Sequence, residues 1–326
     1  MTRRLVLALV GVSLVAAYIA LNDAPTPTSP PTPGRVAAAP AQDRDPGVYK
    51  RAFHPNRLYL PTLIEKIGDE YFIVDSYNNR VLYSDVLHAP IPAWKVLDDA
   101  LSRPHSIASD GRWYLVDDTD ADRVNVYTKR DGEFVAAERI ADIGRRPHRV
   151  LYDEVTQAFF VLASESQQIT KLKAGTAGVV VEHTRHLSFL NGAYTRSMTI
   201  IDNQMFFVSG PGAVVVVDHT SGRYEILETI PVPRRYRSMN DIARIGGSYY
   251  LTATMNRMAR CDSLAALKED RCESVYEQYG LRGNPYYFSR FDGRYYVGEV
   301  AGRDAILVFE ADAGELRLVE VLPSKR

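Results

Sequence analysis

The chain has 326 residues, of which 39 are Lys or Arg and 40 are Asp or Glu, so its formal net charge is only -1. This balance argues against a globally basic nucleic-acid-binding protein, and we expect no nucleic-acid partner. Hydrophobic residues make up 46% and charged residues 24% of the chain, which excludes a wholly disordered protein and a polytopic membrane protein. Two cysteines are too few for a disulfide scaffold or a four-cysteine zinc site.

The N-terminus predicts export from the cytoplasm. Arg3 and Arg4 precede an uncharged run of 17 residues, Leu5 to Leu21, a pattern typical of a signal peptide or a short membrane anchor. Residues 1–22 are therefore expected to form one hydrophobic helix, either an uncleaved anchor or a cleaved signal. Because basic residues before such a helix stay in the cytoplasm, the rest of the chain is predicted to lie on the periplasmic or extracellular side. It is tethered to the membrane if the helix is retained and secreted if the signal is cleaved.

Residues 23–45 predict a linker rich in Pro, Ala and Thr. Six of the 18 prolines fall between residues 24 and 41. Proline fixes φ and removes a hydrogen-bond donor, so this segment is expected to be an extended spacer. The folded domain is predicted to span residues 46–326.

Aromatic pairs recur at a regular spacing through this domain. They are Tyr71-Phe72, Trp113-Tyr114, Phe159-Phe160, Phe206-Phe207, Tyr249-Tyr250 and Tyr295-Tyr296, at steps of 42, 46, 47, 43 and 46 residues. Each pair is followed by aliphatic and then small or acidic residues, as expected of a short β-strand. A second strand is predicted before each pair, a third after it, and a fourth in several units. Six units of four antiparallel strands predict an all-β, six-bladed β-propeller.

One repeat carries a family signature. Residues 71–81 read YFIVDSYNNRV, which resembles the NHL-repeat pattern of two aliphatic residues, Asp, two further residues, Asn, one further residue, Arg and Val. Asp117 to Val124 is a looser copy with a longer spacing between Asp and Arg, and units 3 to 6 depart from the pattern. The chain thus resembles the NHL-repeat-like six-bladed β-propeller family over residues 50–322. That resemblance implies a binding scaffold in most members and an enzyme in some.

The two cysteines lie close together in the sequence. Cys261 and Cys272 bracket a ten-residue segment in which Asp262 or Ser263 can cap a short helix. In an oxidising compartment the pair is expected to form a disulfide. Zinc binding is the alternative, although no His lies nearby.

The first residues of the innermost strands are predicted to meet at one mouth of the central channel. They are Thr62, His105, His148, Met198, Asn240 and Tyr286. His105 and His148 each follow Arg-Pro, and with Asn240 they could hold Zn²⁺ or Ca²⁺, an arrangement that resembles some propeller lactonases and lyases. The alternative is that each His bonds a neighbouring backbone group, and no cofactor is then needed.

Charged residues gather in the loops predicted for the same face. The arginines are Arg57, Arg103, Arg145, Arg146, Arg196, Arg234, Arg235, Arg237 and Arg282. The acids are Asp75, Asp117, Asp118, Asp120, Asp122 and Glu299. Guanidinium groups suit carboxylate, phosphate or sulfate ligands, whereas simple Arg–Asp pairing between loops would contribute little.

These features support two functional hypotheses. The first is a membrane-tethered extracytoplasmic module that binds a small anionic ligand or another extracytoplasmic protein, without a predicted catalytic residue. Its ligand-binding residues are predicted to be Arg103, His105, Arg146, His148, Arg196, Arg237, Asn240 and Tyr286. The second is a metal-dependent hydrolase or lyase, lactonase-like, in which His105, His148 and Asn240 hold the metal.

Overall fold

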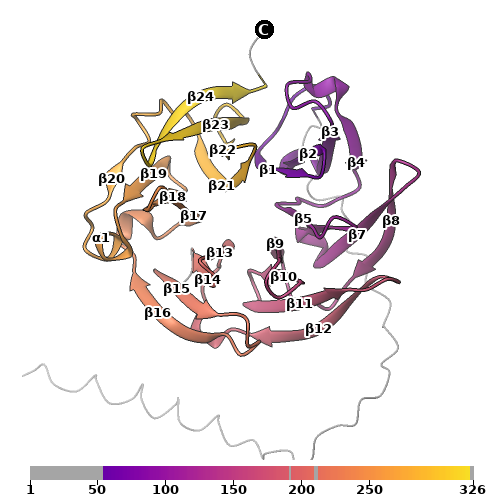
Figure 1. The fold of residues 1–326 in the computed structure, drawn as a ribbon, viewed down its shortest axis with the longest axis horizontal. Coiled ribbons are helices and arrows are strands. Elements are labelled where there is room, and N and C mark those ends of the chain that lie inside the picture. The colour runs from indigo at the N-terminus through magenta and orange to yellow at the C-terminus, as the bar shows by residue number, and fades with distance from the viewer. Residues whose placement is uncertain (1–53, 191, 209–211, 324–326) are drawn as a thin grey trace, which may run out of the picture. The chain divides into compact units, whose positions relative to one another are not determined.

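The computed structural model describes residues 54–190, 192–208 and 212–323. They form six four-stranded antiparallel sheets around a central axis (Figure 1), which confirms the predicted all-β six-bladed propeller. The predicted hydrophobic helix (1–22), the linker (23–45) and the first residues of the predicted domain lie outside the described residues. Within the described part of the chain, no helix is long and apolar enough to span a membrane.

Each blade is built from four consecutive strands. Blade 1 contains β1 (Pro61–Ile67), β2 (Glu70–Asp75), β3 (Arg80–Ser84) and β4 (Lys95–Asp98). Blade 2 contains β5 (Ile107–Ser109), β6 (Trp113–Asp118), β7 (Arg123–Arg130) and β8 (Glu133–Ile140). Blade 3 contains β9 (Pro147–Asp153), β10 (Ala158–Ala163), β11 (Gln168–Ala174) and β12 (Val179–His186).

The second half of the ring follows the same order. Blade 4 contains β13 (Ser197–Ile201), β14 (Gln204–Val208), β15 (Ala213–Asp218) and β16 (Glu225–Pro231). Blade 5 contains β17 (Met239–Ile245), β18 (Ser248–Ala253), β19 (Arg257–Cys261), the helix α1 (Leu264–Lys268) and β20 (Glu273–Ser274). Blade 6 contains β21 (Asn284–Phe291), β22 (Arg294–Val300), β23 (Ala305–Asp312) and β24 (Glu315–Leu322).

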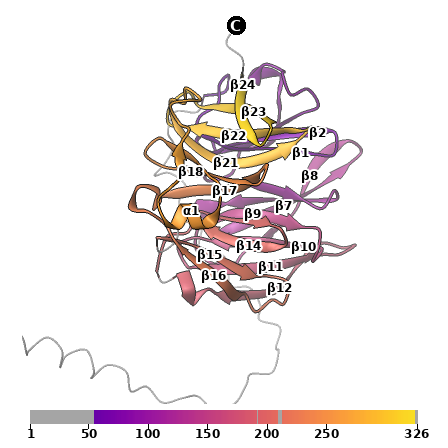
Figure 2. The same ribbon diagram turned by 60° about the vertical axis from the view of Figure 1, so that its left-hand side comes forward.

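Short 3-10 helices occupy several loops. They are η2 (Ser76–Asn78), η3 (Ile91–Ala93), η4 (Thr119–Ala121), η5 (Ser188–Leu190) and η6 (Arg234–Tyr236). Figure 2 shows the ring turned so that the blades near α1 come forward.

The aromatic pairs all lie on the second strands, as predicted, and they bind each blade to both neighbours. Successive side chains of a strand face opposite sides of the sheet. Phe159 therefore packs with Trp113 of blade 2, and Phe160 packs with Phe207 of blade 4. Phe206 in turn faces blade 5, where it contacts Tyr249. The repeating doublet is thus the residue pattern that fills two inter-blade cores at once.

The first strand of blade 2 is shorter than predicted. The sequence predicts a strand from Pro104 to Ile107, but β5 begins at Ile107. The N–H groups of His105 and Ser106 donate instead to the buried carboxylate of Asp117, at 3.0 and 2.6 Å. The Asp117 carboxylate thus accepts the hydrogen bonds that a neighbouring strand would otherwise accept. It fixes the backbone at the channel mouth.

Blades 6 and 1 share no sheet, because each of the six described sheets uses strands from one continuous segment. Blade 6 instead closes the ring by packing closely against blade 1. Gly298 on β22 lies against β1, and a Cβ atom there would collide with the carbonyl oxygens of Pro61 and Thr62. The Asp304 carboxylate also accepts a hydrogen bond from the Leu60 N–H at 3.3 Å.

Cys261 and Cys272 form a disulfide in the structure, with 4.4 Å between their Cα atoms. The bond closes the segment that contains α1, and the Ser263 side chain caps this helix by accepting from the Ala266 N–H at 3.1 Å. This segment stands where the other blades have a longer fourth strand, since β20 has only two residues.

Candidate functional site at the propeller mouth

Two loops of each blade meet on one face of the ring. The leading loop precedes the innermost strand, and the cross loop joins the second and third strands. Backbone hydrogen bonds link the two loops in blades 1, 2, 3 and 5, from Tyr77 to Tyr59, Asp120 to Ser102, Ser164 to Arg146 and Thr254 to Ser238. We call the central part of this face the mouth.

Bulges in the innermost strands place the mouth residues. Thr62, His148 and Asn240 each lie at a register shift between neighbouring strand partners, and Tyr286 lies at a similar irregularity opposite Gly298. A bulge leaves its residue unpaired and re-aims the side chain. All four side chains are buried, so the mouth has a filled floor. Thr62 donates to the His105 carbonyl at 2.8 Å, which joins blade 1 to blade 2 at this level.

Met198 lies in the core and does not belong to this floor. Strand β13 has no bulge, and Met198 pairs directly with Phe207. Its fully buried side chain packs in the core between blades 3 and 4. The missing bulge residue shifts the register by one, so Arg196 and Ser197 occupy the end of the strand at the mouth.

His105 and His148 form a stacked pair. Their ring centroids lie 3.9 Å apart with 26° between the planes. His105 Nδ1 lies 2.9 Å from the Thr119 hydroxyl, and His148 Nδ1 lies 2.8 Å from the Tyr287 hydroxyl. The Tyr286 ring lies beside both imidazoles, with centroids at 6.1 and 6.4 Å. The predicted convergence of the two histidines is therefore seen in the structure.

Both imidazoles are neutral at physiological pH. Burial, and then the positive charges of Arg146 and Arg103, lower the pKa of His105 to about 3. Burial also lowers the pKa of His148 well below its usual range, with His105 and Arg196 adding to the shift. Desolvation disfavours the charged form of a base, so the floor contributes no positive charge of its own.

Three of the predicted arginines surround this floor. Arg103 and Arg146 both bind the carboxylate of Asp120: Arg103 Nη2 lies 2.7 Å from Asp120 Oδ1, and Arg146 Nη1 lies 3.0 Å from the same oxygen. Arg196 comes from blade 4 and approaches the Tyr194 ring at 6.0 Å, while Arg146 approaches that ring at 5.9 Å. Within the described residues, Arg196 has no carboxylate partner.

Arg103 and Arg146 have left-handed backbones. Their φ angles are 53° and 56°, a conformation that costs a residue with a Cβ roughly 1–2 kcal/mol and costs glycine little. A neighbouring blade holds each of them in place, because Asn79 Oδ1 accepts from the Arg103 N–H at 3.1 Å and Asp122 Oδ1 accepts from the Arg146 N–H at 2.8 Å. Leu60 has the same conformation, at φ 53°, in the equivalent position of blade 1.

The other predicted arginines have contacts away from this group. Arg57 contacts His54, Arg145 pairs with Glu165, and Arg235 pairs with Asp270 beside the disulfide. Arg237 is exposed and lies across Gly212, where an added Cβ would approach its Nε to 3.1 Å. Arg234 and Arg282 are also exposed. Of the nine arginines predicted for this face, three surround the histidine pair.

Most of the acids on this face have structural partners. Asp75 accepts from the Tyr59 N–H at 2.7 Å and from Arg80 Nε at 2.8 Å. Asp118 accepts a hydrogen bond from the Ser102 N–H, and Glu299 accepts one from the Arg282 N–H, both at 2.6 Å. These buried cross-loop carboxylates fix the leading loops. The NHL-like Asp75, Asn78 and Arg80 belong to this scaffold, with Asn78 donating to Asp75 Oδ2 at 2.8 Å.

The geometry of His105, His148 and Asn240 does not suit a bound metal. The two rings stack face to face, so the lone pairs in their ring planes do not converge on one point. Asn240 Nδ2 donates to the Pro285 carbonyl at 2.8 Å, and its buried Oδ1 has no partner among the described residues. Three guanidinium groups nearby would repel a cation. Within the described residues, no group of three or more His, Cys, Asp or Glu side chains is arranged to hold a metal ion.

A second polar layer lies along the axis, and sequence reasoning missed it. Arg149, Asp241 and Tyr287 follow the mouth residues by one position on β9, β17 and β21. The Arg149 guanidinium lies 4.3 Å from the centre of the Tyr287 ring. Burial raises the pKa of Glu65, on β1, to about 7, with Arg149 opposing the shift. A polar residue directly after the mouth residue on each of β9, β17 and β21 would have been the signal in the sequence.

Tyr194 and Thr119 are further residues that contact the mouth residues and that the sequence did not single out. Tyr194 is about one-third exposed, at 36%, and its hydroxyl lies 3.3 Å from Arg146 Nε. An aromatic residue two positions before Arg196, in a loop of this face, was the available signal.

No known family model and no curated protein matches the sequence. Among solved structures, a candidate 6-phosphogluconolactonase from Bacteroides uniformis superposes with a TM-score of 0.56 at 13% identity, covering 81% of this chain and 83% of that chain. Hydrazine synthase from Kuenenia stuttgartiensis gives 0.54 at 16% identity over 78% and 77% of the two chains. YCF48, solved with a D1 peptide, gives 0.51 at 14% identity over 76% and 78%. These similarities show the propeller fold, and the narrower NHL resemblance remains an interpretation of residues 71–81.

Proposed function

We propose that this protein is a membrane-tethered, extracytoplasmic β-propeller that binds a small anionic ligand at its mouth through Arg146 and Arg196, with Arg103, Tyr194 and the histidine floor completing the site. The observation that carries this proposal is the charge balance there. Three guanidinium groups surround two neutral imidazoles, and Asp120 is the carboxylate that two of them share.

The surroundings favour an anion that presents paired oxygens. Arg103 and Arg146 already hold the Asp120 carboxylate from two sides, so their donors are arranged for a carboxylate or phosphate group. A buried floor lowers the local dielectric, which strengthens the attraction between guanidinium and anion. The Tyr194 ring, which is 36% exposed, supplies flat apolar surface beside the charges, as in many small-molecule sites.

The tether and the compartment rest on residues 1–45 and on the cysteine pair. A positively charged start, an apolar run and a Pro-rich spacer support an extracytoplasmic propeller, and a disulfide suits an oxidising compartment. Protease added to intact spheroplasts should digest the propeller, whereas protection of the propeller until lysis would contradict this topology.

A ligand panel tests the binding proposal directly. Sugar acids, sugar phosphates and anionic polymers should raise the melting temperature of the full-length protein, and matched neutral sugars should not. If neutral compounds raise it and no anion does, the anion proposal fails. The same panel with added Zn²⁺ or Ca²⁺ examines the lactonase-like alternative, which requires the metal to stabilise the protein and to support hydrolysis of a sugar lactone.

A further inference from the structure

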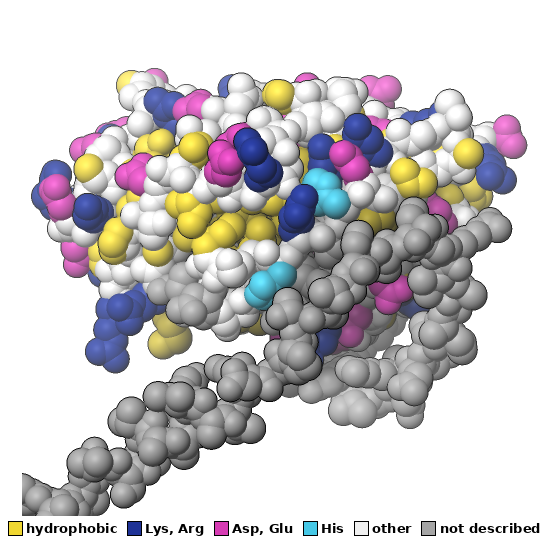
Figure 3. Space-filling model, turned by 90° about the horizontal axis from the view of Figure 1, so that it is seen from below, with side chains coloured by type: hydrophobic (Ala, Val, Ile, Leu, Met, Phe, Trp, Pro, Cys, Tyr) yellow, Lys and Arg dark blue, Asp and Glu magenta, His cyan; other side chains and the backbone are white. Residues whose placement is uncertain are grey.

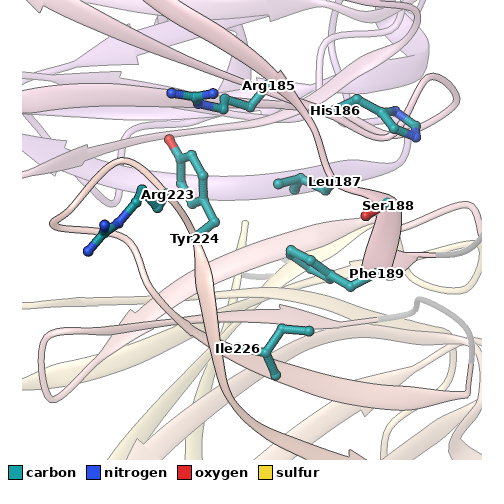
Figure 4. A pocket seen from close by; sticks show the side chains of 8 residues that line it. All are labelled: Arg185, His186, Leu187, Ser188, Phe189, Arg223, Tyr224 and Ile226. Carbon is teal, nitrogen blue, oxygen red and sulfur yellow. The ribbon is translucent and has the colours of Figure 1, made fainter.

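The rim of the propeller carries a groove between blades 3 and 4, away from the mouth. It lies between the end of β12 and the start of β16, with a volume of about 340 Å³ (Figure 4). Residues Arg185, Leu187 and Phe189 line one side, and Arg223, Tyr224 and Ile226 line the other. The two sides come from different blades, so the groove depends on how these blades pack.

The groove has a cationic end and an apolar end. In Figure 4, Arg185 and Arg223 lie on the Tyr224 side of the groove, while Phe189 and Ile226 lie at the other end. No acidic residue is among those that line it. Arg223 pairs with Glu225 at 3.1 Å, but both side chains are largely exposed, so this pair is weak. Arg185 has no ion-pair partner within the described residues.

Exposed aliphatic side chains extend along the same two outer strands. Ile226 and Leu227 on β16 are each 51% exposed, and Val180 and Val181 on β12 are 63% and 45% exposed. Figure 3 views this side of the ring and shows hydrophobic side chains gathered at the surface beside basic ones. Such an apolar patch, bordered by polar groups, is typical of a protein-interaction surface.

Leu227 differs in exposure from the residues at the same position in blades 1 and 6. Leu227 lies at a bulge of β16, and Leu97 and Val319 lie at the matching bulges of β4 and β24. Those two side chains are half-buried against inter-blade cores. Leu227 is more exposed, and the next blade has only the two-residue β20 as its outer strand.

We propose that this groove docks an extended acidic segment of a partner protein. The carboxylates of the segment bind Arg185 and Arg223, and an aliphatic side chain next to them packs between Phe189 and Ile226. Charge complementarity favours an acidic partner, because two guanidinium groups line the groove and the neighbouring acid, Glu225, is exposed and paired only with Arg223. A protein segment fits better than a small molecule, since the apolar surface continues onto Leu227 and the outer strands have open edges.

Defined peptides test the proposal. The probe is a fluorescein-labelled hexapeptide of alternating Glu and Leu, titrated with the full-length protein and followed by anisotropy. Two control peptides replace every Glu by Lys or every Leu by Ser. We expect saturable binding of the probe, at least tenfold tighter than that of either control. Absence of saturable binding up to about 1 mM protein, or equal binding of the Lys peptide, would overturn the proposal.

Variants locate the binding. Arg185→Glu with Ile226→Ser should weaken probe binding at least tenfold, and both residues are exposed, so the fold should tolerate the change. The matched control, Arg139→Glu with Val96→Ser, alters exposed outer-strand residues of blades 2 and 1 and should leave binding within about twofold. The mouth variant Arg146→Ala with Arg196→Ala should also leave it unchanged, and loss of binding there would place the peptide at the mouth instead.

Sedimentation velocity tests whether a second copy of the chain occupies the groove instead of an acidic partner. The proposal expects a monomer whose sedimentation coefficient is the same for wild type and for Ile226→Ser. A dimer that Ile226→Ser dissociates would show that the groove is an interface between copies, and it would overturn the proposal of an acidic partner.

Discussion

Two sets of acidic side chains lie on the mouth face, and they differ in burial and in partners. Asp75, Asp117, Asp118 and Glu299 are fully buried and bind backbone N–H groups of the leading loops. Asp120 is partly exposed and binds the side chains of Arg103 and Arg146. The comparison separates the scaffold, which fixes the loops, from the site, which presents charge. Changes in the first set should affect stability, and changes in the second should affect binding.

The largest effect is expected for Asp75→Ala. This change leaves the Arg80 guanidinium, which is 4% exposed, without its carboxylate, and breaking a buried pair from one side typically costs about 3–5 kcal/mol. The free energy of unfolding in urea should fall by about that amount. The control is Glu133→Gln, which removes the exposed partner of Lys95 and should change stability by less than about 1 kcal/mol. Equal losses in the two variants would show that burial does not distinguish the two sets.

The pH dependence of stability should be the next largest effect. Folded His105 stays neutral to a pKa of about 3, whereas the unfolded chain takes up this proton near pH 6.5. Its contribution to stability is therefore fully present above pH 6.5 and is lost as the pH falls toward 3. Between pH 8 and pH 5 the wild type should lose about 2 kcal/mol more from this residue than His105→Gln does.

Glu65 should act in the opposite direction. Its pKa is about 7 in the folded state and 4.5 by reference, so its contribution is fully present below pH 4.5 and is lost as the pH rises through 7. Replacing it by Gln should make the loss of stability between pH 8 and pH 5 steeper, by roughly 2 kcal/mol. Urea unfolding at the two pH values measures both variants, and identical pH profiles for them would contradict these ionisation states.

Asp120→Asn should increase anion affinity. The change removes the negative charge that Arg103 and Arg146 share, so a ligand no longer competes with it. A charge-assisted contact typically contributes about 1.5–3 kcal/mol, and recovering part of it should tighten binding of a sugar phosphate several-fold. Calorimetric titration measures the change. Weaker binding in Asp120→Asn would mean that Asp120 positions the arginines instead of competing for them.

The smallest expected effect concerns the strained backbone of Arg146. Both Arg146→Gly and Arg146→Ala remove the guanidinium, but only Ala keeps a Cβ at φ 56°. The Gly variant should therefore be more stable than the Ala variant by about 1 kcal/mol. Both should bind the anion equally weakly. A more stable Ala variant would contradict the left-handed conformation.

The sequence predicts the blades well because their signal is local. Aromatic pairs such as Phe159-Phe160 must fill two inter-blade cores at once, and this requirement repeats in the second strand of every blade. The predicted start of β5 at Pro104 was wrong. The Asp117 carboxylate, and not a neighbouring strand, accepts hydrogen bonds from the N–H groups of His105 and Ser106. A contact between residues eleven and twelve positions apart leaves no periodic pattern in the sequence.

The candidate site was predictable only in part. Two Arg-Pro-His tripeptides placed His105 and His148 correctly at the mouth. The position of Met198 depends on whether its innermost strand has a bulge. The position of Arg237 depends on which arginines find local partners. Neither property repeats periodically in the sequence. Met198 entered the core because β13 lacks the bulge residue. Asp120 looked like the other loop acids, and only its contacts distinguish it.

The central claim is that Arg146 and Arg196 form an anion site at the mouth, and calorimetric titration of a sugar phosphate tests it most directly. We expect the double variant Arg146→Ala with Arg196→Ala to lose about 2 kcal/mol or more of binding free energy, which is roughly 30-fold in Kd. The matched control, Arg237→Ala with Arg282→Ala, removes two exposed arginines of the same face and should bind like the wild type. Equal affinity in the wild type and in the Arg146 and Arg196 variant would contradict the account.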